Sequence, residues 1–162
     1  MTAVLVAGAG NIFRADDGFG VAVAARLGRS PLPPGVTVQD YGIRGLHLAY
    51  ALLEPVGLLI VADAVSRGEA PGTLFVIEPD ENGDSELADP HGMSLPAVFA
   101  SVTALGGTLP RVLIVGCEPA ELGEGIGLSA VVERAVGPAV ELIQEILARE
   151  LPAINATEEE RP

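Results

Sequence analysis

Short, continuously apolar runs alternate along the chain with longer stretches in which apolar residues recur at helical spacing. A short run without polar alternation is typical of a strand that is covered on both faces of a sheet. The runs predict strands at residues 3–7, 36–40, 58–61, 73–77 and 111–115, and the periodic stretches predict helices at 18–27, 46–53, 94–105 and 129–149. This alternation predicts an α/β fold with three αβα layers, in which helices cover both faces of a mainly parallel, twisted five-stranded sheet.

Two local features refine this picture. Pro71-Gly72 leads directly into the predicted fourth strand, and so short a connection cannot hold a crossover helix, so we expect that strand to be antiparallel. Residues 1–150 are expected to form a single α/β domain. The remaining residues 151–162 are acidic and are expected to be a mobile tail after the last helix.

The segment from Gly8 to Gly20 places two adjacent carboxylates between a buried strand and a helix. Its glycines do not fit a dinucleotide-binding fingerprint, because Phe13 occupies the position that needs a third small residue. Either aspartate, Asp16 or Asp17, can cap the helix by accepting hydrogen bonds from N–H groups of its first turn. Because there are two of them, one can cap while the other stays available for chemistry.

Further polar residues follow other strands. Parallel strands share one carboxyl edge, so Asp16, Asp17, Asp40 and Asp63 should lie along it, and the polar loop 79–90 delivers His91. Carboxylates with an imidazole suit a divalent ion, and the nitrogen favours nickel, zinc or iron over magnesium. Each residue also has a simpler interpretation. The aspartates can hydrogen-bond nearby turns, and the histidine can be a solvated loop residue.

Composition narrows the function classes. The formal charge is −13, and all nine basic residues are arginines, so we expect no nucleic-acid partner and no phosphate-loop or Schiff-base lysine. The single cysteine, Cys117, excludes an internal disulfide and is expected to be a buried core residue. No apolar run approaches the ~20 residues of a membrane span. The first strand follows the start of the chain without a basic export-type segment, so a cytoplasmic protein without membrane contact is expected.

The order and spacing of several motifs resemble the hydrogenase maturation proteases, which trim the C-terminus of the large subunit of nickel–iron hydrogenases. The resemblance covers the chain from Val4 to about Leu147. It rests on Gly8-Ala9-Gly10-Asn11, Asp16-Asp17-Gly18-Phe19-Gly20, Asp40-Tyr41-Gly42 with Gly45, Ile60-Val61-Ala62-Asp63-Ala64 with Pro71-Gly72, Pro90-His91, and Gly116-Cys117-Glu118-Pro119 with Gly127-Leu128-Ser129.

The resemblance implies a metal-directed endopeptidase in which Asp17, Asp63 and His91 bind the metal and carry the catalysis. Asp16 and Asp40 are then expected to lie near these ligands without binding the metal directly. The implied metal is nickel that the substrate supplies, which zinc or cadmium could replace in the free protein. The implied partner is a hydrogenase large-subunit precursor, from which a C-terminal peptide is removed, and the protease is expected to be a monomer.

Two other functions stay open from the residues alone. A binding module of the same fold could escort an immature metalloprotein without cutting it, because a fold does not determine a function. A magnesium-dependent phosphotransfer domain also gathers aspartates at strand ends. The absence of lysine and the position of Asp16-Asp17, well past the strand rather than at its tip, disfavour that second alternative.

Overall fold

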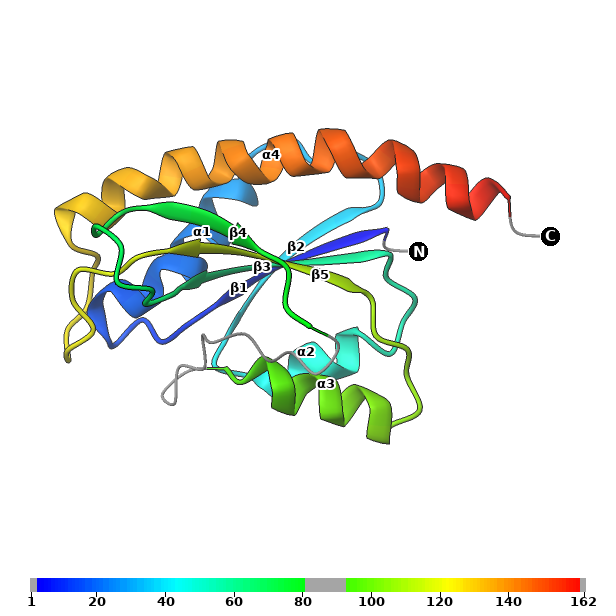
Figure 1. Cartoon of the computed structure of the whole chain (residues 1–162), viewed down its shortest axis with the longest axis horizontal. Helices are drawn as coiled ribbons and strands as arrows, with labels where there is room; N and C mark the ends of the chain where they lie inside the picture. The colour runs from blue at the N-terminus through cyan, green and yellow to red at the C-terminus, as the bar shows by residue number, and fades with distance from the viewer. Residues whose placement is uncertain (1–2, 81–92, 161–162) are drawn as a thin grey trace.

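A single sheet forms the centre of the computed structural model, which describes residues 3–80 and 93–160 apart from the side chain of Glu158. Its strands lie in the spatial order β2 (Val36–Gly42), β1 (Val4–Ala9), β3 (Leu58–Ala64), β5 (Arg111–Cys117) and β4 (Leu74–Ile77) (Figure 1). The pairs β1–β2, β1–β3 and β3–β5 are parallel, whereas β4 runs antiparallel to β5. The predicted five-stranded sheet with one antiparallel strand is therefore confirmed.

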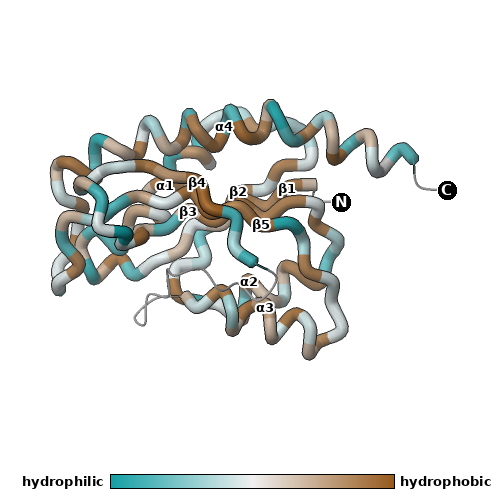
Figure 2. Tube along the Cα trace, in the orientation of Figure 1, coloured by the Kyte–Doolittle hydropathy of each residue, from teal (hydrophilic) through white to brown (hydrophobic). Residues whose placement is uncertain are grey.

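Helices cover both faces of this sheet. The helices α1 (Phe19–Leu27) and α4 (Ala130–Glu159) contact each other on one face, and α2 (Gly45–Ala51) and α3 (Leu95–Ala104) contact each other on the opposite face (Figure 1). Alternate residues of β1 enter two separate cores, with Val4 and Val6 facing α1 and α4, and Leu5 and Ala7 facing α2 and α3. Hydrophobic residues accordingly gather along the middle of the sheet (Figure 2). Burial on both faces is what the unbroken apolar sequences of the central strands predict.

A short 3-10 helix, η1 (Ala15–Gly18), precedes α1 and was not predicted from the sequence. It lies against the sheet because the start of α1 approaches the strands very closely. A Cβ on Gly20 would overlap the backbone carbonyl oxygens of Ala9 and Ala62, so only glycine allows this approach. Close packing at Gly20 thus brings the Asp16-Asp17 pair to the carboxyl edge of β1 and β3.

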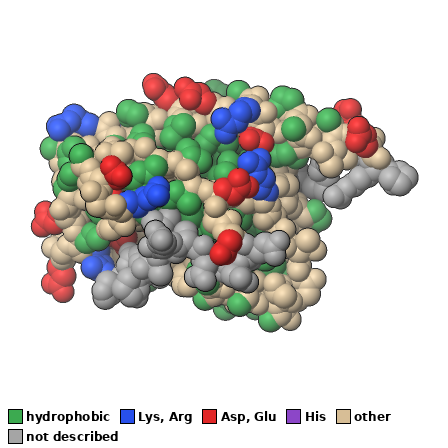
Figure 3. Space-filling view, viewed as in Figure 1, with side chains coloured by type: hydrophobic (Ala, Val, Ile, Leu, Met, Phe, Trp, Pro, Cys, Tyr) green, Lys and Arg blue, Asp and Glu red, His purple; other side chains and the backbone are tan. Residues whose placement is uncertain are grey.

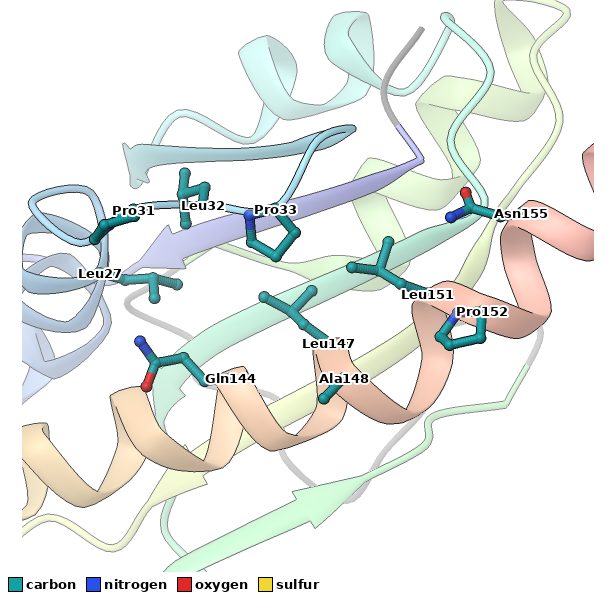
Figure 4. A pocket seen from close by; sticks show the side chains of 10 residues that line it. All are labelled: Leu27, Pro31, Leu32, Pro33, Gln144, Leu147, Ala148, Leu151, Pro152 and Asn155. Atoms are coloured by element: carbon teal, nitrogen blue, oxygen red, sulfur yellow. The ribbon is translucent and has the colours of Figure 1, made fainter.

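The last helix is longer than predicted. The sequence predicted an end at Arg149 and a tail from residue 151, whereas α4 continues through Pro152 to Glu159. Leu147 and Leu151 point from α4 into a groove that Leu27, Leu32 and other residues line (Figure 4). Ile154, one turn further, packs against the same core. Burial of this apolar stripe stabilises the helix beyond the proline, which removes only one hydrogen bond of the ladder.

The length of α4 does not make it a membrane span. It has 30 residues but carries charged side chains throughout. Within residues 3–80 and 93–160, no helix is both long and apolar enough to cross a bilayer.

Candidate functional site

The order of the strands defines a switch point at the carboxyl edge of the sheet. The chain leaves β1 through α1 to reach β2 on one side, whereas β3 pairs with β1 on the other side. Ligands of open α/β sheets bind where the connections diverge in this way. The predicted residue Asp17 follows β1, and Asp63 lies near the end of β3, so the two residues flank the switch point.

Asp17 lies in η1, and its side chain turns back toward the end of β1. The residue is 1% exposed, and its Oδ2 atom accepts a hydrogen bond of 2.8 Å from the backbone N–H of Asn11. The intervening Gly10 has φ +129°, and a Cβ there would overlap the backbone carbonyl oxygen of Asp17. Glycine at this position therefore lets η1 fold directly over the tip of β1.

Asp63 reaches the same place from β3. Its Oδ1 atom lies 3.6 Å from the position that a Cβ of Gly10 would occupy. The residue is half-buried, in contrast to the fully buried Asp17. The structure thus brings these two predicted residues together around Gly10, and both make further interactions within the chain.

Asp40 lies beside this pair, at the end of β2. The N–H of Gly10 donates a 2.9 Å hydrogen bond to the carbonyl oxygen of Gly42, which joins the ends of β1 and β2. Asp40 Oδ1 and the Gly10 carbonyl oxygen both lie 3.7 Å from the Cβ position of Gly42. Asp40 is exposed, so its carboxylate adds negative charge at the solvent side of the switch point.

Asp16 faces away from these residues, although it adjoins Asp17 in the sequence. Its carboxylate accepts hydrogen bonds from the N–H groups of Ala120, Glu121 and Ser129, at 2.9, 2.9 and 2.7 Å, and from the Ser129 hydroxyl at 2.9 Å. Burial raises the pKa of Asp16, but the hydrogen bonds from Ser129, Glu121 and Ala120 outweigh burial and hold the pKa below its ordinary value. The ionised carboxylate of Asp16 therefore holds the loop between β5 and α4 in place.

Glu118 also holds a loop in place through its buried carboxylate, a role that the sequence did not reveal. Its buried carboxylate accepts hydrogen bonds from the N–H groups of Arg67 and Gly68, at 2.7 and 3.2 Å. These two residues belong to the loop that follows Asp63, so Glu118 fixes the exit from β3. A charged residue directly after the buried strand β5 was the available signal, but its partners lie about fifty positions earlier in the chain.

His91, the third predicted metal ligand, lies outside the described residues. Among residues 3–80 and 93–160, no group of three histidine, cysteine or acidic side chains has the arrangement of a metal site. Asp17 and Asp63 would supply two oxygen ligands, and a complete site would need a donor from elsewhere. Two carboxylates with an imidazole form a ligand set that suits nickel or zinc.

The side chains that could act as nucleophiles nearby are engaged in other ways. Cys117 is fully buried, and burial, followed by the negative charges of Asp16 and Glu118, raises the pKa of its thiol to about 11. The thiol is therefore protonated at neutral pH, as expected for a core residue. The Ser129 hydroxyl donates to Asp16. His47 is exposed on α2.

An αβα domain with acidic residues at the switch point of its sheet belongs to the large class of α/β enzymes that bind ligands at this edge. Within that class, the sequence matches the HycI family of hydrogenase maturation proteases over residues 21–146. The match spans most of the chain. The chain therefore belongs to the hydrogenase maturation protease family, as its motifs suggested, and is a hydrolase.

Individual relatives agree with this assignment. The chain is 34% identical over 151 residues to the hydrogenase expression/formation protein HupD of Bradyrhizobium diazoefficiens, covering 90% of this chain and 78% of HupD. It is 31% identical to the hydrogenase 2 maturation protease of Escherichia coli, covering 86% of this chain and 87% of that protein. The structure superposes on the hydrogenase maturating endopeptidase HybD from Escherichia coli with a TM-score of 0.79 and 29% identity, covering 93% and 94% of the two chains. These relatives favour a peptidase over an escort module or a phosphotransfer domain.

Proposed function

We propose that this protein removes a C-terminal peptide from the nickel-loaded precursor of a nickel–iron hydrogenase large subunit, and that Asp17, Asp63 and His91 bind the nickel of the substrate. The observation that carries the proposal is the approach of Asp17 and Asp63 around Gly10 at the switch point. Family membership supplies the reaction class, and the acidic ligands supply a reason for metal dependence.

Contacts within the chain hold two of the proposed ligands, Asp17 and Asp63, at the carboxyl edge. The backbone N–H of Asn11 orients the carboxylate of Asp17, and Glu118 holds the loop that follows Asp63. Holding ligands in place before binding lowers the entropic cost of assembling the complex. When the substrate's nickel is bound, it supplies a Lewis acid, which can polarise the scissile carbonyl or lower the pKa of an attacking water.

Mass spectrometry of a purified precursor tests this function directly. The precursor is incubated with the protein in two forms, one loaded with nickel and one nickel-free. We expect a discrete C-terminal peptide to be released from the loaded form alone. Release from both forms would overturn nickel recognition, and release from neither form of a competent precursor would overturn the proposed reaction.

The place of His91 is tested by exchanging each of the two histidines in turn. The variant His91→Ala should lose peptide release while keeping its circular dichroism spectrum and its Tm. The matched variant His47→Ala removes an exposed imidazole from α2 and should cleave at the normal rate. Normal cleavage by His91→Ala would remove this residue from the proposed site.

A further inference from the structure

Large apolar side chains are exposed beside the acidic residues of the switch point. Ile12 and Phe13, in the loop between β1 and η1, are 46% and 62% exposed, and Ile126, in the loop between β5 and α4, is 80% exposed. We name these three residues the apolar rim. Exposed apolar groups that gather near a functional site are typical of surfaces that bind another molecule.

The two loops of the rim are joined although they lie more than a hundred positions apart in the sequence. The N–H of Gly125 donates to the carbonyl oxygen of Phe13 at 3.0 Å, and the N–H of Ala15 donates to the carbonyl oxygen of Gly125 at 2.8 Å. Figure 1 shows the loop before α4, in yellow, beside the blue segment that leads into α1. Backbone hydrogen bonds therefore join the loop that carries Phe13 to the loop that carries Ile126.

Additional hydrogen bonds hold these two loops in place. The Asp16 carboxylate binds the N–H groups of Ala120 and Glu121, and the Arg14 guanidinium donates to the carbonyl oxygen of Leu122 at 3.0 and 3.2 Å. The apolar side chains thus project from a backbone fixed by many bonds. A surface that is already ordered loses less conformational entropy when a partner covers it, which favours binding.

The acidic site has apolar residues on its other side as well. Ile43, between β2 and α2, and Leu46, in the first turn of α2, are both more than half exposed and border a small cavity of about 150 Å³ next to α3. Asp40 lies just before them in the chain. A chain segment crossing the switch point from the α1 side to the α2 side would meet apolar contacts before and after the acidic residues.

Charge further restricts the partner. Glu121 and Glu124 are exposed in the same loop as Ile126, whereas the guanidinium of Arg14 is engaged with Leu122. The corresponding end of the molecule shows acidic and basic side chains among hydrophobic ones in the space-filling view (Figure 3). An acidic segment would be repelled here, whereas an apolar segment would gain contact area with the apolar rim.

We infer that the apolar rim docks an apolar stretch of the substrate polypeptide next to the scissile bond and thereby contributes to substrate affinity rather than to the chemical step. This inference rests on the proposed function, since it takes the hydrogenase precursor as the partner. The rim is continuous with the acidic site through Asn11, whose N–H binds Asp17 and whose side chain accepts a hydrogen bond from the N–H of Phe13.

The test compares Phe13→Ser and Ile126→Ser with Leu105→Ser. Leu105 is 49% exposed at the far end of α3, so it is a matched apolar control away from the carboxyl edge. Peptide release gives KM and kcat, and biolayer interferometry on immobilised nickel-loaded precursor gives Kd. We expect each rim variant to raise KM and Kd about tenfold, as for a residue central to an interface. The kcat should change less than twofold, and Leu105→Ser should behave as the wild type.

Each other result has a distinct meaning. Unchanged KM and Kd in both rim variants would overturn the inference while leaving peptide release, and so the proposed function, intact. If the wild type binds the precursor without cleaving it, the proposed function is overturned. The Kd values would still show whether the apolar rim contributes to binding of the precursor. The wild type could instead sediment as a dimer that Phe13→Ser dissociates, while KM stays unchanged. That result would show that the apolar rim binds a second copy of this chain and would overturn the docking of substrate.

Discussion

The two edges of the sheet use charged side chains in opposite ways. At the amino edge, Arg111 pairs with Glu78 at 2.8 Å and with Glu150 at 2.9 Å, so charges neutralise each other at the surface. At the carboxyl edge, Asp16 and Glu118 are buried and bind backbone N–H groups, while Arg14 and Arg44 donate to backbone carbonyl oxygens. Backbone groups thus hold the acidic side chains in place without cancelling their charge, which suits an edge that we propose to bind the substrate's nickel.

Removing one proposed ligand should produce the largest effect. We expect Asp63→Asn to reduce release of the C-terminal peptide at least about a hundredfold, because Lewis-acid stabilisation is worth several kcal/mol and about 1.4 kcal/mol corresponds to a factor of ten. The exchange keeps the size of the side chain, so Tm should stay close to that of the wild type. The rate is measured by mass spectrometry with nickel-loaded precursor.

A matched exchange at the opposite edge controls for the loss of one negative charge. Glu54 is exposed and precedes β3, so Glu54→Gln changes the net charge equally without altering the switch point. It should cleave at the wild-type rate. Equal losses in the two variants would indicate that the total charge matters, rather than the position of Asp63.

Asp16→Ala should cause the largest loss of stability. The exchange leaves three backbone N–H groups and the Ser129 hydroxyl without their acceptor, and an unsatisfied buried donor costs about 1–3 kcal/mol. Because water can reach part of the loop after the exchange, we expect a total loss of about 3 kcal/mol in the free energy of unfolding. Urea denaturation followed by circular dichroism measures it.

The neighbouring exposed residue Glu124 offers the comparison for this loop. Glu124→Ala should change the free energy of unfolding by less than about 0.5 kcal/mol, as is usual for surface positions. A similar value for Asp16→Ala would contradict the part assigned to its carboxylate.

The contribution of Asp16 should also depend on pH. Its pKa in the folded protein lies below the ordinary value of 3.8, so the folded state favours the charged form. The resulting stabilisation is fully present above that ordinary value and is lost as the pH falls through the lower folded pKa. The difference in unfolding free energy between the wild type and Asp16→Asn should therefore be constant from pH 7 to about pH 5 and shrink below pH 4. If this difference in unfolding free energy grew on acidification, the pKa of Asp16 would be raised in the folded protein rather than lowered.

The fold and the proposed ligands could be predicted from the sequence to different extents. The strands β1, β3 and β5 are buried on both faces, so their apolar runs marked them clearly, and the shared edge of parallel strands placed Asp17 near Asp63. The task of Asp16 could not be predicted, because its partners lie more than a hundred positions away in an irregular loop. The assignment of His91 as a ligand stays a prediction.

The end of α4 shows the same limit for local signals. Pro152 was a local reason to end the helix, but Leu151 and Ile154 pack against the core formed by α1 and the sheet. Tertiary burial therefore outweighed the loss of a single backbone hydrogen bond. A local sequence pattern predicts a helix or strand well when the periodicity of that segment determines which residues are buried. It predicts the element less well when contacts with residues distant in the sequence determine the burial.

The smallest effect is expected at the amino edge, in Glu78→Gln. A hydrogen bond from Arg111, followed by the charge of Arg111, holds the pKa of Glu78 below its ordinary value of 4.5, so this ion pair stabilises the fold above that pH and less as the pH falls through the folded pKa. Both side chains are about half exposed, and water and salt screen their attraction. We expect no measurable change in the urea midpoint at 0.15 M salt, and a small decrease at low salt. A loss as large as that of Asp16→Ala would mean that surface pairs at the amino edge stabilise the domain as strongly as the buried carboxylates do. The buried carboxylates of the carboxyl edge would then no longer be distinguished by their energetic contribution, only by their position beside the proposed nickel ligands.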